Sequence, residues 1–208
     1  MSLKDQNKPA KVIAFFLLAV LYSWIVGVPI FDVGAAFEGA GLKGLVNTKS
    51  LIFISLSIAS LALDGLVPKH VKEKIVHRRF NNPLPGSRAF TRVALNDSRI
   101  DMDAIEAKYG PLPTAPAEQN KTFYKISKSC HDAVGVKDAH RSYLLFRDLS
   151  FDTYILSLFA TVCTASFGMG VAKSMLVLAA GIGAAFLLSV IATNFANRFV
   201  CNVLAQAK

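Results

Sequence analysis

Long uncharged runs dominate the pattern of hydrophobic and polar positions along this chain. No charged residue occurs between Lys11 and Asp32, so 12–31 is an apolar run of 20 residues. Comparable runs cover 50–68, 153–172 and 174–197, and Asp64 is the single charge within them. About 20 helical residues cross the roughly 30 Å hydrocarbon core of a bilayer. The pattern therefore predicts an all-α, polytopic membrane protein with four transmembrane helices, over 12–31, 50–66, 153–172 and 174–197.

The polar remainder divides the chain into three parts. A first transmembrane hairpin covers 1–66, a basic segment covers 67–150, and a second hairpin covers 151–208. Within the basic segment, apolar spacing and helix-start residues predict helices from Pro68, from Asp101 to Gly110, and over 118–128. A helix over 136–147 is expected to run into the third span. Strand signals are weak, and only 90–95 is expected to be extended.

Lysine and arginine are distributed unevenly about these spans. The tail, the basic segment and the C-terminal end hold 20 of the 23, whereas the hairpin connections hold only Lys43, Lys49 and Lys173. Because basic residues accumulate on the cytoplasmic side, we expect both termini and 68–148 in the cytoplasm. The glycine-rich connection 32–49 is expected to be an external loop, with a short interfacial or re-entrant helix as the alternative. The connection 166–173 is expected to be a tight external hairpin.

Composition agrees with this interpretation. The chain has 208 residues, of which 53% are hydrophobic and 18% charged, against roughly 25% charged in soluble domains. The net charge of +9 is explained first by anionic lipids at the membrane surface, and nucleic acid is disfavoured as a partner of this chain alone. Five basic residues after Pro68 are expected to contact lipid headgroups: Lys69, Lys72, Lys74, Arg78 and Arg79.

A proline-rich turn follows these basic residues, over 81–91. Two prolines and a glycine disfavour helix there and predict a rigid turn. Successive N–H groups at 86–88 suggest an anion-binding nest as the functional alternative. We expect partner binding through Asn82, Gly86, Ser87 and Arg88, with the Arg88 guanidinium pairing bidentately with a carboxylate or phosphate.

Catalytic and metal motifs are absent from the sequence. The three cysteines, Cys130, Cys163 and Cys201, form no C-x-x-C pair, and His70 and His77 are seven residues apart, too far to share a metal. Asp101 and Asp103 suit a helix start better than a metal site. We therefore expect no enzyme, no metal and no cofactor.

Polar and small residues within the spans suggest two further roles. Asp64 and Asn194 are intramembrane polar residues, and an acidic residue in a span marks an ion path or a salt bridge. Ala179, Gly181 and Gly183 have the spacing of a helix-packing face. Such a face packs within one bundle or between subunits, and we expect a homo-oligomer.

The order of the spans around a basic insert, together with Asn82–Phe90 (NPLPGSRAF) and Glu118-Gln119-Asn120, resembles small multi-span membrane proteins of bacterial anti-phage defence operons, such as the Kiwa membrane subunit. The resemblance implies an inner-membrane subunit with a soluble partner that senses or executes, and it carries over no functional residue. Our hypothesis is a non-enzymatic, oligomeric membrane subunit whose cytoplasmic segment binds a soluble partner or relays a membrane signal. The alternative is a small ion channel or pore-forming effector.

Overall fold

Every regular element among the described residues is helical. The computed structural model describes residues 3–27 and 66–207, so the prediction of an all-α fold is confirmed for this part of the chain. In chain order the α-helices are α1 (Leu3–Val26), α5 (Lys69–Val76), α6 (Met102–Tyr109), α7 (Pro116–Ser129), α8 (Val134–Ser166) and α9 (Val171–Gln206). Three short helices follow α5, namely η2 (Pro85–Arg88), η3 (Ala89–Val93) and η4 (Ala94–Asn96).

Three of the described helices are long and apolar enough to cross a membrane. These are α1, α8 and α9, with 24, 33 and 36 residues. They contain most of the first and third expected spans and all of the fourth, because α8 ends at Ser166, short of 172. The expected second span, 50–66, and the connection 32–49 lie outside the described residues except for Leu66.

Helix ends in this part of the chain follow capping chemistry. Asp101 is the N-cap of α6, and its carboxylate accepts a hydrogen bond from the backbone N–H of Ala104 at 3.0 Å. The helix ends at Gly110, whose φ of +86° favours glycine. Helix α8 runs without a break from Val134 to Ser166, as the sequence predicts. Four residues then connect it to α9, which confirms the tight hairpin.

The expectation of an extended segment over 90–95 is wrong. Residues 89–93 form a π-helix and 94–96 a 3₁₀-helix. The side chain of Gln119 accepts hydrogen bonds from the backbone N–H groups of Phe90 and Thr91, at 3.2 and 3.3 Å. These tertiary contacts satisfy donors that a strand would have paired elsewhere. The segment before this π-helix also differs from the expectation. The sequence disfavours helix over 81–91, but Pro85 begins a 3₁₀-helix.

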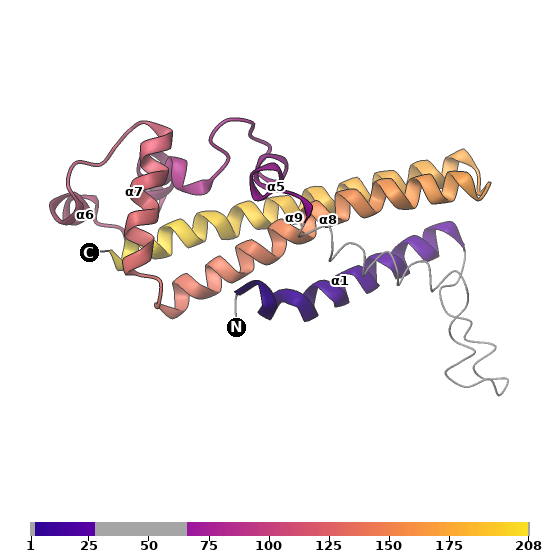
Figure 1. Cartoon of the computed structure of the whole chain (residues 1–208), viewed down its shortest axis with the longest axis horizontal. Helices are drawn as coiled ribbons and strands as arrows, with labels where there is room; N and C mark the ends of the chain where they lie inside the picture. Colours follow the sequence, from indigo (N-terminus) through magenta and orange to yellow (C-terminus); the bar gives the residue numbers. More distant parts are fainter. Residues whose placement is uncertain (1–2, 28–65, 208) are drawn as a thin grey trace. The chain divides into compact units, whose positions relative to one another are not determined.

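The described residues divide into two compact units. Unit 1 comprises 3–4, 69–148 and 187–207, and unit 2 comprises 5–27, 66–68 and 149–186. In unit 1, α7 lies against the C-terminal part of α9 (Figure 1), where the rings of Phe123 and Phe199 meet edge to face at 5.6 Å. Val200, Val203 and Leu204 are fully buried in the same core. The end of α9 therefore supplies much of the core on which the basic segment folds.

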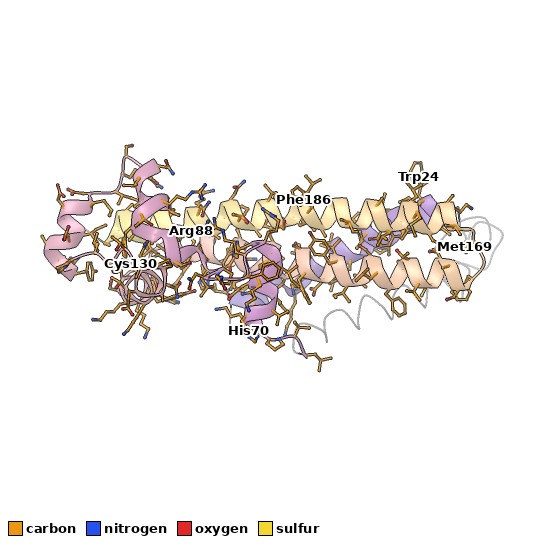
Figure 2. The ribbon with its side chains drawn as sticks, turned by 90° about the horizontal axis from the view of Figure 1, so that it is seen from above. Trp24, His70, Arg88, Cys130, Met169 and Phe186 are labelled. Atoms are coloured by element: carbon orange, nitrogen blue, oxygen red, sulfur yellow. The ribbon has the colours of Figure 1, made fainter. Side chains whose placement is uncertain are left out.

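Unit 2 buries polar side chains and exposes apolar ones. Lys11 and Asp152 form an ion pair with Nζ and Oδ2 3.4 Å apart, and their side chains are 5% and 0% exposed. On the outer surface, Trp24 is 80% exposed and projects away from α1, and Phe186 projects from α9 (Figure 2). Aqueous globular proteins do not favour this distribution, whereas lipid contact does.

Candidate functional site

The proline-rich turn is built onto α7. A Cβ placed at Gly86 would lie 2.6 Å from the ring of Phe123 and 2.7 Å from the Asn120 side chain, so only glycine allows this approach. The buried Ser87 hydroxyl donates to the backbone carbonyl of Asn82 at 2.8 Å and also bonds the carbonyl of Leu84. The two segments that carry the sequence resemblance, 82–90 and 118–120, therefore pack against each other.

One donor of the suggested anion nest over 86–88 is used inside the turn. The N–H of Ser87 bonds the carbonyl of Leu84 at 3.1 Å. Ala89, the residue directly after this range, bonds the carbonyl of Gly86 through its N–H, as the 3₁₀ geometry requires. Fewer backbone donors are therefore left for an anion than the sequence suggests.

The four expected partner-binding residues do not share one surface. Asn82 and Ser87 line a hollow of about 430 Å³ together with Phe80, Leu84 and Asn120. Gly86 is buried against α7. Arg88 instead lines a different hollow on unit 1, which we call the arginine hollow. Figure 2 shows Arg88 on unit 1 beside α9.

The arginine hollow is a strongly basic concave site of about 430 Å³. Its lining comes from the residues directly after α5, from η2, η3 and η4, and from α9, and no carboxylate of the described residues belongs to it. Sequence reasoning assigned Arg78 and Arg79 to headgroup contact and Arg88 to partner contact, but the fold brings all three together. The lining residues are His77, Arg78, Arg79, Arg88, Arg92, Val93, Asn96, Thr193, Asn197 and Cys201.

Among these side chains, the charge and the N–H donors of Arg88 are the least offset by neighbouring acceptors or negative charges. Its Nε is buried and has no hydrogen-bond partner among residues 3–27 and 66–207. The pKa of Arg88 is lowered, first by burial and then by the charges of Arg79 and Arg92. A buried donor without an acceptor costs roughly 1–3 kcal/mol. An anion placed beside Arg88 would supply that acceptor and offset the repulsion.

His77 forms part of the wall of the hollow and is itself held by neutral groups. Its Nδ1 lies 3.3 Å from the Thr193 hydroxyl and its Nε2 lies 3.2 Å from the Tyr143 hydroxyl. Burial lowers the pKa of His77 to about 4, and nearby arginines, Arg88 first among them, lower it further in the same direction. The imidazole is therefore neutral near pH 7.

A buried charged cluster lies in unit 1, and no motif or spacing in the sequence predicts it. The Arg147 guanidinium is 1% exposed and donates to Oδ1 of Asp148 from Nε at 2.9 Å and from Nη2 at 2.7 Å. Its Nη1 lies 3.7 Å from Oε1 of Glu73, and Lys69 Nζ lies 3.5 Å from the same oxygen. Burial raises the pKa of Glu73, and the charges of Lys69 and Arg147 oppose that rise. The cluster joins α5 to α8, and a structural role explains its contacts.

The residues expected at lipid headgroups differ in exposure. Lys69 and Lys74 are exposed on α5, as headgroup contact requires. Lys72 is only 1% exposed, because its face of α5 packs inward with Val76. Arg78 bonds the Ser189 hydroxyl and lines the arginine hollow with Arg79.

The small residues of α9 separate into inner and outer positions. Gly181 is buried, and a Cβ there would overlap the Ser157 side chain and the Tyr22 hydroxyl. Gly183 and Ala179 are exposed, and no atom of the described residues lies within 4 Å of a Cβ at Gly183. Gly181 is therefore a packing position within unit 2. Of the intramembrane polar residues, Asn194 is exposed on α9, and Asp64 lies outside the described residues.

The described part of the chain contains no site arranged for metal binding or for thiol chemistry. No group of three or more His, Cys, Asp or Glu side chains is placed to hold a metal ion among residues 3–27 and 66–207. Cys130, Cys163 and Cys201 are free thiols. Burial, and then the nearby Asp97, raise the pKa of the Cys201 thiol to about 11, which disfavours nucleophilic chemistry there.

The fold and this site define a class of protein: helical throughout its described residues, with three helices able to cross a membrane and a basic hollow on unit 1. Comparisons with protein-family models, with curated proteins and with solved structures give no match for this chain.

Proposed function

We propose that this protein is a non-enzymatic integral membrane subunit whose unit 1 binds an anionic group of a partner in the arginine hollow. The single observation that carries the proposal is the convergence of four arginines on one hollow that, in the part of the chain the structure describes, no carboxylate lines. Arg88, with its buried and unpartnered Nε, is the central contact. Guanidinium groups bind carboxylate and phosphate through paired hydrogen bonds, which gives such a site specificity as well as attraction.

The setting of this function is the bacterial inner membrane. The distribution of lysine and arginine favours an arrangement with both termini and 68–148 in the cytoplasm. A soluble cytoplasmic partner, as the resemblance to anti-phage defence subunits implies, would then reach unit 1 directly. Assembly into a homo-oligomer would present several such hollows together.

The test compares what remains bound to the full-length protein after gentle extraction from membranes. Wild type, Arg88→Ala, Arg88→Lys and Arg141→Ala would be purified in parallel and their bound components quantified by mass spectrometry. Arg141→Ala is the matched control, because it removes a guanidinium that does not line the hollow. We expect at least one component to fall about tenfold in both Arg88 variants and to persist in Arg141→Ala. A set of bound components that is the same in all four proteins would contradict the proposal.

An ion channel is the second candidate function, favoured by the buried pair of Lys11 and Asp152 in unit 2. Lys11 and Asp152 directly precede the apolar runs 12–31 and 153–172, and buried ionisable residues at the end of a span suggest an ion or proton path. Conductance in planar bilayers, abolished in Asp152→Asn protein that still inserts, would support this alternative. Correctly inserted wild-type protein that gives no conductance in planar bilayers would argue against the channel.

A further inference from the structure

The arginine hollow carries more positive charge than a single carboxylate would balance. Four guanidinium groups line it, from Arg78, Arg79, Arg88 and Arg92. The rest of its lining is neutral near pH 7, including the His77 ring, whose pKa is about 4. Like charges that share a small site repel each other unless a counter-charge enters.

The polar lining suits a ligand with many acceptor oxygens. Guanidinium groups contribute forked N–H donors and accept nothing. The Asn96 and Asn197 amides add further donors from η4 and α9, whereas the Thr193 hydroxyl already donates to the Ser189 carbonyl at 2.9 Å. A phosphoryl group presents three acceptor oxygens and about 1.5–2 negative charges, whereas a carboxylate presents two oxygens and one charge.

From this geometry we infer that the arginine hollow binds a ligand bearing two linked phosphoryl groups, with Arg88 and Arg92 as principal contacts. Two phosphoryl groups carry about three to four negative charges in a free diphosphate and about two when both are diesters, so either ligand offsets much of the repulsion among the guanidiniums. The volume of about 430 Å³ is that of a small-ligand site and exceeds what one phosphate group fills. The inference rests on the proposed function, because it names the chemical class of the anionic group.

Such a ligand has two sources that share this chemistry. Thr193 and Asn197 lie at the end of the apolar run 174–197, where the sequence predicts the cytoplasmic membrane surface. At that level, the hollow is within reach of a lipid headgroup with two phosphates, such as cardiolipin. It is equally within reach of a soluble diphosphate.

The soluble arm uses full-length protein in phosphatidylcholine nanodiscs, titrated calorimetrically with inorganic pyrophosphate, orthophosphate and citrate. We expect pyrophosphate to bind at least tenfold more tightly than orthophosphate or citrate. Arg88→Lys and Arg92→Gln should each weaken pyrophosphate binding at least tenfold, because each loses forked donors. Lys125→Ala, which removes an exposed charge from α7 outside the hollow, should change it less than twofold.

The lipid arm replaces part of the phosphatidylcholine with cardiolipin, or with phosphatidylglycerol at equal charge. Retention of cardiolipin over phosphatidylglycerol by wild type, lost in Arg88→Lys, would assign the site to the lipid. Pyrophosphate binding without cardiolipin preference would assign it to a soluble ligand. If neither probe binds, or if citrate equals pyrophosphate, the inference is overturned.

The two sets of experiments distinguish failure of the proposed function from failure of this inference. If bound components still depend on Arg88 while neither phosphate probe binds, the partner's anion is a carboxylate, and only the inference is wrong. If pyrophosphate binds through Arg88 while the bound components are the same in every variant, the ligand class stands and the partner hypothesis fails.

Discussion

The hydroxyl of Tyr22 on α1 lies 2.6 Å from Oγ of Ser157 on α8, and Gly181 of α9 lies directly against both groups. Three helices of unit 2 therefore meet at one polar contact that leaves no room for a side chain at Gly181. In an apolar environment a hydrogen bond of this kind holds helices together where hydrophobic association is weak. The contact explains why one glycine of α9 is buried and its near neighbour Gly183 is not.

Gly181→Val should lower the thermal unfolding midpoint of the detergent-solubilised protein substantially. The added methyl groups would overlap Ser157 and Tyr22, and overpacking of this kind costs about 1–3 kcal/mol. Gly183→Ala is the matched control, because its Cβ meets nothing within 4 Å and alanine favours the helix by about 1 kcal/mol. Equal midpoints for the two variants would show that α9 does not pack at Gly181 as described.

Asp152→Asn should lower the free energy of unfolding more than replacement of both Lys11 and Asp152 by apolar residues. The Lys11 ammonium is 5% exposed, so loss of the carboxylate leaves a buried charge without its counter-ion, at about 3–5 kcal/mol. A Lys11→Met, Asp152→Leu double variant should recover much of the loss, because an apolar pair avoids desolvation. Unfolding measurements on the full mutant cycle give the coupling directly. Additive effects of the two substitutions would show that the residues do not interact.

Local sequence signals predicted the six α-helices of the described residues, because each had a physical cause within a few residues. Asp101 and Gly110 specify the start and end of α6 through capping, and uncharged length specifies α1, α8 and α9. The π-helix after Arg88 was missed because its stability depends on Gln119, which lies 28 or more residues away.

For the same reason, only part of the candidate site could be predicted from the sequence. Arg88 was identified from its turn, but its companions Arg78, Arg79 and Arg92 converge only when α5, the short helices and α9 pack together. The buried cluster of Glu73, Arg147 and Asp148 has no spacing motif, so nothing local predicts it. Burial of Lys72 likewise depends on which face of a short helix packs inward.

Acidification should destabilise unit 1 through His77. The pKa of this imidazole is about 4 in the folded protein, below its ordinary value of 6.5, so the unfolded chain binds the proton more readily. The stabilising contribution of the neutral ring is therefore complete above pH 6.5 and is lost as the pH falls from 6.5 to 4. Arg78, Arg79, Arg88 and Arg147 all disfavour the imidazolium.

The measurement is the unfolding midpoint of wild type and His77→Gln between pH 8 and pH 4. Glutamine keeps polar contact with Thr193 and Tyr143 but takes up no proton in this range. We expect wild type to lose up to roughly 3 kcal/mol more than the variant across the window. Parallel pH profiles for the two proteins would show that His77 does not control this response.

Gly183→Leu should lower the oligomer mass if the outer face of α9 packs between subunits. Gly183 and Ala179 are exposed on that face, which leaves a small-residue surface open to a second copy. Native mass spectrometry in mild detergent would compare wild type with Leu187→Ala, which alters an exposed apolar residue of α9 without adding bulk. An unchanged mass in folded Gly183→Leu protein would assign this face to lipid instead.

The orientation of the chain should place Cys130 in the cytoplasm and the connection between α8 and α9 outside. The 20-to-3 distribution of lysine and arginine is the reason, since basic residues are retained on the cytoplasmic side. A membrane-impermeant maleimide applied to intact cells should therefore leave Cys130 unlabelled in protein carrying Cys163→Ser and Cys201→Ser. Phe167→Cys in a background without native cysteines should be labelled, because Phe167 is 65% exposed in that connection.

Cell lysis should make Cys130 reactive and serves as the control for accessibility. Labelling of Cys130 in intact cells, with Phe167→Cys protected, would reverse the proposed orientation and remove the arginine hollow from the reach of cytoplasmic partners.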